Sequence, residues 1–313
     1  MIYFSVAETA KRWGVSERSG LGYCAEGKID GAFLTGKTWN IPETAEKPNR
    51  INKKTDAPKT LLEVLKAEKA AKLHGGIYHK IQIDLTYNSN HIEGSRLTHD
   101  QTRYIFETNT IGASDGAVKV DDVVETANHF KCFDFVLDTI DMPITEEYVK
   151  QLHRILKSGF MAEQNPEVVV GEYKKYASVV GGIITAKPAD VPRQMAVLLQ
   201  KYETHSALDL YDVAQFHVEF EKIHPFYDGN GRVGRLLLFK MCLANAIVPF
   251  GIDERHKMFY YMGLKEWQQE HQPNRLLDVF LSMQDDMKAV LDYFEILYPH
   301  LEQTSRELIA KHS

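Results

Sequence analysis

The stretch HPFYDGNGRVGR, residues 224–235, decides how this sequence is interpreted. Pro225 disfavours helix at the residue before it, so a preceding amphipathic helix is expected to end at His224. The Gly-Asn-Gly turn at residues 229–231 then lets backbone N–H groups converge, and a new helix is expected to start near its end. A glycine-rich turn that opens a helix is an anion site, and phosphate is its usual ligand.

Charged side chains surround this expected anion site. Arg232 and Arg235 project from one face of the first helical turn, where guanidinium groups suit the outer phosphates of a nucleotide. Asp228, just before the turn, is placed to hold Mg²⁺ between two phosphates. His224 is a base that titrates near neutral pH. The combination predicts phosphoryl-group chemistry, in which a base activates a hydroxyl while cations stabilise the transferred charge.

The same stretch resembles the signature loop of the Fic family, whose pattern is HPFxDGNGRxxR, and every fixed position is met. The related Doc kinases carry Lys where this chain has Gly231, which argues against that branch. The resemblance implies that ATP binds with its α-phosphate facing His224. It further implies that AMP passes to a Tyr, Ser or Thr hydroxyl of a target protein, and that Phe226 anchors the loop in the core.

The resemblance also implies roles for individual loop residues. His224 is the general base and Asp228 holds Mg²⁺. Asn230, together with the amides of Gly229 and Gly231, holds the α- and β-phosphates of ATP. These roles agree with the chemistry that the residue types suggest by themselves.

Two arginines and a tyrosine complete the implied nucleotide site. By resemblance, Arg232 reaches the β-phosphate and Arg235 the γ-phosphate. FYYMGLKEW, residues 259–267, falls where family members often line the adenine pocket, so Tyr260 or Tyr261 is expected to stack on the base. We favour Tyr261 for this role, and packing in the helical core is the equal alternative.

A second motif, SNHIEG at residues 89–94, lies far upstream of the loop. Ser89 and Glu93 are four residues apart and therefore share a helical face. Alone the pattern is weak, but it resembles the (S/T)xxxE(G/N) inhibitory motif of Fic proteins, here on a helix at about 77–94. A Glu93 carboxylate paired with Arg235 would occupy the place of the γ-phosphate and misalign ATP for in-line attack.

The sequence leaves the net direction of the reaction open. In some Fic proteins the inhibitory glutamate serves AMP removal, so an AMP-removing hydrolase is an alternative.

The segment 177–186 predicts a β-hairpin, because two apolar pairs flank Gly181-Gly182. By resemblance this hairpin is the flap that holds a target protein, which can be the chain itself.

The first part of the chain predicts a separate domain over residues 1–45, followed by a linker at 46–60 that contains Pro48 and Pro58. Ser5 and Glu8 form a capping box at the start of a short helix. The expected order of helix, turn, helix and hairpin resembles a winged helix-turn-helix. DNA binding by this domain, and so a DNA-binding regulator with a nucleotide-sensing Fic domain, is a further alternative to a docking or oligomerisation module.

Composition sets outer limits on the function. The chain has 313 residues and a net charge of -6, which gives no sign of a generally nucleic-acid-binding surface. Three scattered cysteines predict free thiols in a reducing cytoplasm, and no apolar run is long enough to span a membrane. Histidines form no HExxH pair, and His217 is expected in the core. Relatives oligomerise, so a homo-oligomer is also expected.

The fold class follows from these observations. Apolar residues recur mostly at helical spacing after the linker, with the hairpin as the exception. We therefore expect a mainly α-helical, Fic-type core over residues 61–313 with one β-hairpin flap, preceded by the small winged-helix-like domain. GRLLLFKMCLANAI, which is apolar nearly all round, is expected to be the buried central helix.

Overall fold

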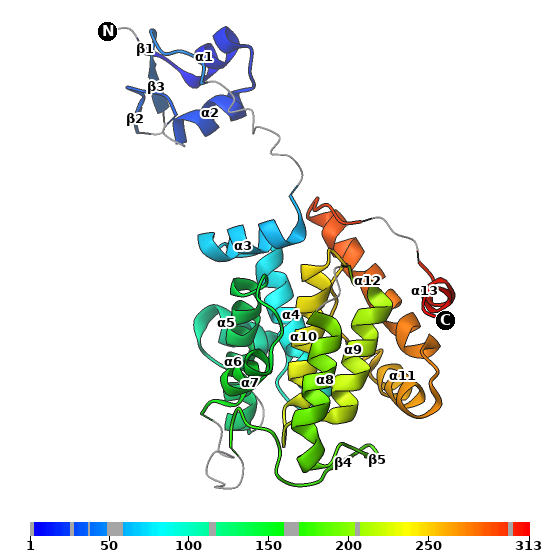
Figure 1. The fold of residues 1–313 in the computed structure, drawn as a ribbon. Coiled ribbons are helices and arrows are strands. Elements are labelled where there is room, and N and C mark those ends of the chain that lie inside the picture. The colour runs from blue at the N-terminus through cyan, green and yellow to red at the C-terminus, as the bar shows by residue number, and fades with distance from the viewer. Residues whose placement is uncertain are drawn as a thin grey trace. The chain divides into compact units, whose positions relative to one another are not determined.

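The chain forms two compact units, residues 1–57 and 58–313, and each is described by itself (Figure 1). The computed structural model describes residues 3–25, 28–36, 38–48, 59–112, 117–159, 169–203, 207–299 and 303–313. The linker predicted at 46–60 lies mostly outside these ranges.

The first unit contains two helices and a three-stranded antiparallel sheet. Its elements are β1 (Tyr3–Phe4), α1 (Val6–Trp13), α2 (Glu17–Ala25), β2 (Phe33–Thr35) and β3 (Thr38–Pro42), with strand order β1-β3-β2. The predicted capping box is confirmed, because the Glu8 N–H donates to Ser5 Oγ and the Ser5 N–H donates to Glu8. The helices and the hairpin occur in the predicted order, whereas β1 was not predicted.

The close packing of α1 against the helix α2 accounts for one glycine of α2. A β-carbon at Gly20 would lie 3.0 Å from Val6 Cγ1, so glycine permits the close packing of α1 against α2. The exposed side chains described on α2 are uncharged or acidic: Glu17, Ser19, Leu21 and Ala25. DNA readers rely on Lys and Arg for phosphate contacts. Winged-helix character and DNA binding by the first unit stay predictions.

The second unit is mainly helical with one short hairpin among its described residues, as the sequence predicts. Its helices are α3 (Leu61–Ala71), α4 (Ile77–Ile92), α5 (His99–Thr108), α6 (Val120–Asp138), α7 (Glu146–Lys157), α8 (Val191–Glu203), α9 (Leu210–Ile223), α10 (Asn230–Ala244), α11 (Lys257–Glu270), α12 (Asn274–Tyr293) and α13 (Ser305–Lys311). The hairpin strands are β4 (Val179–Val180) and β5 (Ile183–Ile184), followed by a 3₁₀ turn at Pro188–Asp190.

The helix α10 is the centre of this unit (Figure 1). Every residue from Arg232 to Leu243 is buried, and α10 packs against α4, α6, α7 and α9. The prediction of a buried central helix is therefore confirmed. Because α10 begins inside the core, the loop before it is fixed by neighbours on several sides.

Two predictions from composition can be compared with the structure. Cys24, Cys132 and Cys242 are free and buried, so the prediction of free thiols is confirmed. Within the described ranges, no helix has the length and apolarity needed to cross a membrane.

Candidate active site

The loop predicted from the motif joins α9 to α10. The helix α9 ends at Ile223, and His224 follows in the left-handed backbone region with φ 52°. Gly229 has φ 83° and precedes the first residue of α10. A left-handed histidine is uncommon and needs support from its surroundings. The Lys174 N–H supplies some of it by donating to the Pro225 carbonyl at 2.8 Å.

The side chain of Asn230 bonds to the backbone of the same loop. Its Oδ1 accepts from the Phe226 N–H at 2.8 Å, and its Nδ2 donates to the Phe226 carbonyl at 2.9 Å. The buried Asn230 amide therefore holds the loop in shape. The resemblance implied phosphate contact by Asn230, and in this structure its backbone N–H, rather than its side chain, is available for that role.

His153 of α7 packs against the loop and bonds to its backbone. Its ring stacks on the fully buried Phe226 with ring centroids 3.9 Å apart. Nδ1 accepts from the Gly171 N–H at 2.9 Å, so Nε2 carries the proton and donates to the Asp228 carbonyl at 3.0 Å. Burial lowers the pKa of His153 to about 4, which keeps this arrangement neutral. The expected anchoring of Phe226 in the core is confirmed.

The N-terminus of α10 carries the predicted anion site, and a carboxylate lies on it. The first amides of a helix have no partner within the helix and attract negative charge. A β-carbon at Gly231 would overlap Glu93 Oε1, so only glycine permits the carboxylate to come this close. Glu93 therefore lies where a phosphate group would be bound.

The same carboxylate pairs with Arg235. Arg235 Nη2 donates to Glu93 Oε1 at 2.8 Å and to the Ser89 carbonyl at 2.8 Å, while Nε donates to Ser89 Oγ at 3.0 Å. Arg235 is buried. Burial opposes ionisation of Glu93, yet Arg235 and Arg232 hold the pKa of Glu93 below its usual range. At neutral pH the pair is ionised, and Nε and Nη2 of Arg235 are both engaged.

Arg232 belongs to a second cluster of charges. It pairs with Glu125 of α6 and donates to Asp228 at 3.2 Å. Lys157 of α7 bridges the same two carboxylates, at 2.7 Å from Glu125 and 2.5 Å from Asp228. Burial opposes ionisation of Asp228, but Arg232 and Lys157 bring its pKa down to about 2. The cluster fixes both Arg232 and Asp228 beside the anion site.

Glu125→Leu is expected to lower the stability of the second unit by ~3–5 kcal/mol, because it leaves Arg232 and Lys157 buried without the more buried of their two shared carboxylates. Thermal and urea unfolding would measure the change. The matched control is Glu219→Leu, which removes a partly exposed partner of Lys201 and is expected to cost about 1 kcal/mol or less. Equal losses in the two variants would contradict this account of the cluster.

His224 is well placed to act as a base. Its side chain is only 15% exposed, and burial together with Lys174 lowers its pKa to about 4. The Glu221 carboxyl lies 4.0 Å from His224 Nδ1, and burial raises the pKa of Glu221 to about 8. Because Glu221 is mainly protonated at neutral pH, it carries little charge and does little to raise the pKa of His224. His224 is therefore neutral at pH 7 and can accept a proton.

Lys174 connects the hairpin to the histidine. Its buried ammonium donates to Thr185 Oγ1 at 2.6 Å, to Ser178 Oγ at 3.1 Å and to the Ile223 carbonyl at 3.3 Å. Ser178 and Thr185 flank the two hairpin strands, and Ile223 is the last residue of α9. Because burial lowers the pKa of Lys174 to about 8, its charge is still largely present at neutral pH. Lys174 thus fixes the hairpin relative to His224.

Asp228 has the properties needed to bind a cation together with a phosphate. Its Oδ1 accepts from the Gly229 N–H at 2.6 Å and its side chain is about half exposed, so lone pairs remain open to solvent. Mg²⁺ commonly takes one or two carboxylates and completes its shell with phosphate and water. The residues present fit such a shared site better than a cage made by the protein alone.

The two candidate tyrosines on α11 differ in their surroundings. Tyr260 is buried and its hydroxyl lies 2.7 Å from His217 Nε2, so core packing is the outcome for this residue. His217 is fully buried, which confirms its expected place in the core. Tyr261 is 42% exposed, and partial burial followed by the charge of Glu93 raises its pKa to about 12. Of these two tyrosines Tyr261 is the one open to solvent, and stacking on a base stays a prediction for it.

The structure thus brings the predicted residues of the loop and of the 89–94 motif together at the start of α10. Sequence reasoning missed several supporting residues: Glu125, His153, Lys157, Lys174 and Glu221. Four of these are single charged residues within helical or turn segments, where a solvent-exposed position is the usual expectation. Nothing in the local pattern distinguishes them, because the burial of Glu125, Lys157 and Glu221 arises from the packing of α6, α7 and α9 around α10, and that of Lys174 from contacts with the hairpin and the end of α9.

Residues 143–242 match the family described as Fic/DOC. The protein named protein adenylyltransferase Fic of Drosophila grimshawi is 28% identical over 244 residues, which cover 73% of this chain and 46% of that protein. The protein of the same name from Drosophila willistoni is 30% identical over 192 residues, covering 57% and 35%. The chain spans less than half the length of these curated relatives.

Solved structures show the same fold. A Fic domain containing signaling protein from Bacteroides thetaiotaomicron has a TM-score of 0.59 at 23% identity, covering 75% of this chain and 96% of that one. Fic-1 (residues 134–508) from C. elegans has a TM-score of 0.58 at 18% identity, covering 75% and 71%. Residues 143–242 therefore match the Fic/DOC family, and the second unit of this chain has the fold of Fic proteins.

Proposed function

We propose that residues 58–313 transfer AMP from ATP to a Tyr, Ser or Thr hydroxyl of a protein, and that Glu93 holds this activity low. The observation that supports this proposal is the position of the Glu93 carboxylate. It lies at the amides of the first turn of α10 and pairs with Arg235. A carboxylate there mimics the outer phosphate of a nucleotide in charge and position. The relatives named protein adenylyltransferase Fic support ATP as the substrate.

The chemistry needs one proton acceptor and an anion cradle. In the proposed step His224 takes the proton of the target hydroxyl, whose oxygen attacks the α-phosphorus of ATP. The new O–P bond forms as the bond to the β-phosphate bridge breaks, and pyrophosphate leaves. Arg232, the first amides of α10 and, once released, Arg235 stabilise the phosphate charge. Mg²⁺ held by Asp228 and the phosphates would neutralise part of that charge.

The hairpin offers a surface for the target protein. Val179 is 65% exposed and Ile184 80% exposed, which is unusual for apolar residues of a two-stranded hairpin. Both strands of such a hairpin have an open edge, so an extended peptide can add to it by main-chain hydrogen bonds. Lys174 fixes the hairpin relative to His224, which would bring a bound hydroxyl near the base.

The position of the transferred label tests the proposal. The Glu93→Gly protein is incubated with Mg²⁺ and ATP that carries ³²P at either the α- or the γ-phosphate, with and without host lysate. AMP transfer predicts protein-bound label from α-labelled ATP and none from γ-labelled ATP. The reverse result would indicate a kinase, and no label from either would remove the proposal.

AMP removal from a modified protein is the second candidate, favoured by the partly exposed Glu93 carboxylate at the anion site. A carboxylate there can orient a water toward a bound phosphate. The two functions respond oppositely to one substitution, because Glu93→Gly frees Arg235 for transfer but deletes the group that removal would need. DNA binding by residues 1–45 and homo-oligomer formation stay predictions.

A further inference from the structure

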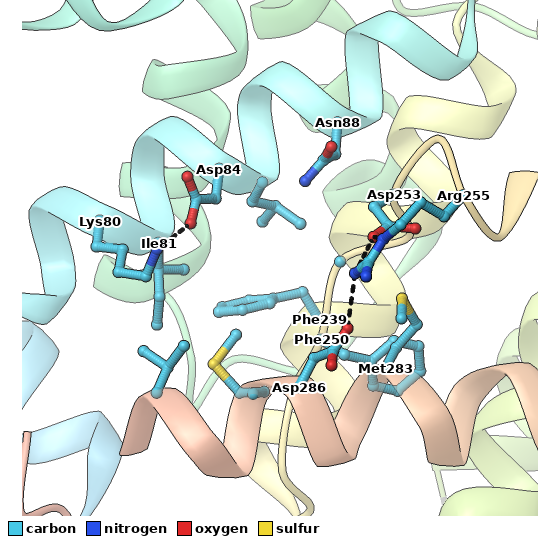
Figure 2. A pocket seen from close by; sticks show the side chains of 14 residues that line it. Lys80, Ile81, Asp84, Asn88, Phe239, Phe250, Asp253, Arg255, Met283 and Asp286 are labelled. Carbon is cyan, nitrogen blue, oxygen red and sulfur yellow. Dashed lines mark hydrogen bonds and ion pairs between the residues drawn. The ribbon is translucent and has the colours of Figure 1, made fainter. Parts of the chain in front are cut away.

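A cavity lies between α4, α10, α12 and the segment 250–255 (Figure 2). None of its lining residues belongs to the loop between α9 and α10. Its volume is about 360 Å³, which is within the size range of small-molecule sites. Its floor is apolar and is formed chiefly by Ile81, Leu85, Phe239, Phe250, Met283 and Met287. Methionines adapt to ligands of different shape, so this floor suits a compact aromatic or aliphatic body.

The rim of the cavity has an excess of negative charge. Its charged side chains are three carboxylates and two cations, which sum to a net charge of −1. They are Asp84, Asp253, Asp286, Lys80 and Arg255. Lys80 pairs with Asp84 at 2.7 Å, and Arg255 pairs with both Asp286 at 3.0 Å and Asp253 at 2.6 Å (Figure 2). His99 and His256, which lie outside the lining, approach Asp84 and Asp253 at 2.8 and 2.7 Å. The cations are therefore engaged, and an added anion would meet repulsion from the carboxylates. An added ammonium group would be attracted.

Asn88 adds an unpaired polar group at the mouth. It belongs to the same face of α4 as Asp84, and it lines the cavity. Its side-chain amide has no hydrogen-bond partner within the described part of the chain. An amide both donates and accepts, so it can bond to a polar end group of a ligand. The site thus combines an apolar floor with a polar, cation-attracting edge.

The cavity touches both helices that hold the Glu93–Arg235 pair. Phe239 is four residues after Arg235 on α10, and Leu85 is four residues before Ser89 on α4, so each lies one turn along the same helical face. Ser89 itself bonds Arg235. A molecule in the cavity would therefore contact α4 and α10 one turn from the pair.

We propose that this cavity binds a small amphipathic amine and that binding strengthens the hold of Glu93 on Arg235. The cavity is formed in the structure in which this pair is closed, and a ligand stabilises the conformation to which it binds more tightly. Filling the space between α4, α10 and α12 opposes movement of α4 away from α10. The regulatory part rests on the proposed function, whereas the binding part does not.

Calorimetry with three matched indoles tests the binding. Tryptamine, tryptophol and indole-3-propionate share one apolar body and differ in the charge of the end group. The cavity predicts tightest binding for tryptamine and weakest for indole-3-propionate. Val290→Trp, at a partly exposed lining residue, should abolish binding by filling the space, and Asp286→Asn should weaken tryptamine selectively. Absence of binding at millimolar concentration, a reversed order, or an unaffected Val290→Trp variant would overturn the site.

Coupling to the inhibitory pair has its own measurement. Reciprocity requires that the tryptamine Kd rise in Glu93→Gly, by about fivefold or more for a typical coupling. In Ser89→Ala, which weakens the pair, tryptamine should reduce AMP transfer, and in Glu93→Gly it should have no such effect. An equal Kd in wild type and Glu93→Gly would overturn the coupling. If no variant transfers AMP but the Kd values differ as expected, the proposed function and the regulation of transfer fail, while ligand binding and its coupling to the Glu93–Arg235 pair stand.

Discussion

Glu93→Gly is expected to raise the rate of AMP transfer by roughly 30-fold or more. The Glu93 carboxylate holds Arg235 by a charge-assisted hydrogen bond of 2.8 Å and covers the amides that open α10. Bonds to charged groups contribute ~2 kcal/mol, which corresponds to about 30-fold in an equilibrium. Without the carboxylate, Arg235 and these amides become available to the phosphates of ATP. Initial rates of label transfer from α-³²P-ATP measure the change.

Glu93→Gln is the matched control for this experiment. Glutamine keeps the size of the side chain and can still accept a hydrogen bond from Arg235, but it carries no charge. Its rate should therefore lie between those of wild type and Glu93→Gly. Equal rates in all three proteins would show that Glu93 does not limit transfer. A variant that loses an AMP-removing activity of the wild type would instead favour the second candidate function.

The sequence predicted the centre of the site because local rules govern it. Pro225 ends α9 by steric exclusion, and Gly229 supplies a positive φ before α10, so the loop could be placed without tertiary information. The contact between Glu93 and Arg235 spans two distant segments. It was expected only through the family resemblance, since spacing alone does not reveal which helices meet.

The parts that were not predicted depend on how helices rotate against one another. Tyr260 and Tyr261 differ by about 100° around α11, and only packing against α9 decides that Tyr260 faces His217. Glu125 and Lys157 look like solvent-exposed helical charges, yet their helices turn them toward Arg232. Asn230 was assigned to phosphate, whereas its amide bonds to Phe226 to close the loop. The cases of Tyr260, Glu125 and Lys157 need a tertiary neighbour that sequence spacing does not identify, whereas the Asn230 contact is local.

His224→Ala, made in the Glu93→Gly protein, is expected to lower AMP transfer by about 10²- to 10⁴-fold, the range typical of a lost general base. ATP affinity should change little, because the proposed function assigns the phosphates to Arg232, Arg235 and the amides of α10 rather than to the imidazole. Rates of label transfer and the calorimetric Kd for ATP, measured on the same samples, separate the two effects. A loss of ATP binding as large as the loss of rate would assign His224 to binding instead of proton transfer.

The pH profile of the Glu93→Gly protein tests the state of His224 without altering it. A base must be deprotonated to act, and burial with Lys174 lowers the pKa of His224 to about 4. Its contribution to kcat/KM is therefore present above that pH and lost as pH falls through about 4. An unperturbed histidine would instead begin to lose activity near pH 6.5. A level kcat/KM between pH 7 and about pH 5 supports a buried, neutral base, and an acid limb centred near pH 6.5 would contradict it.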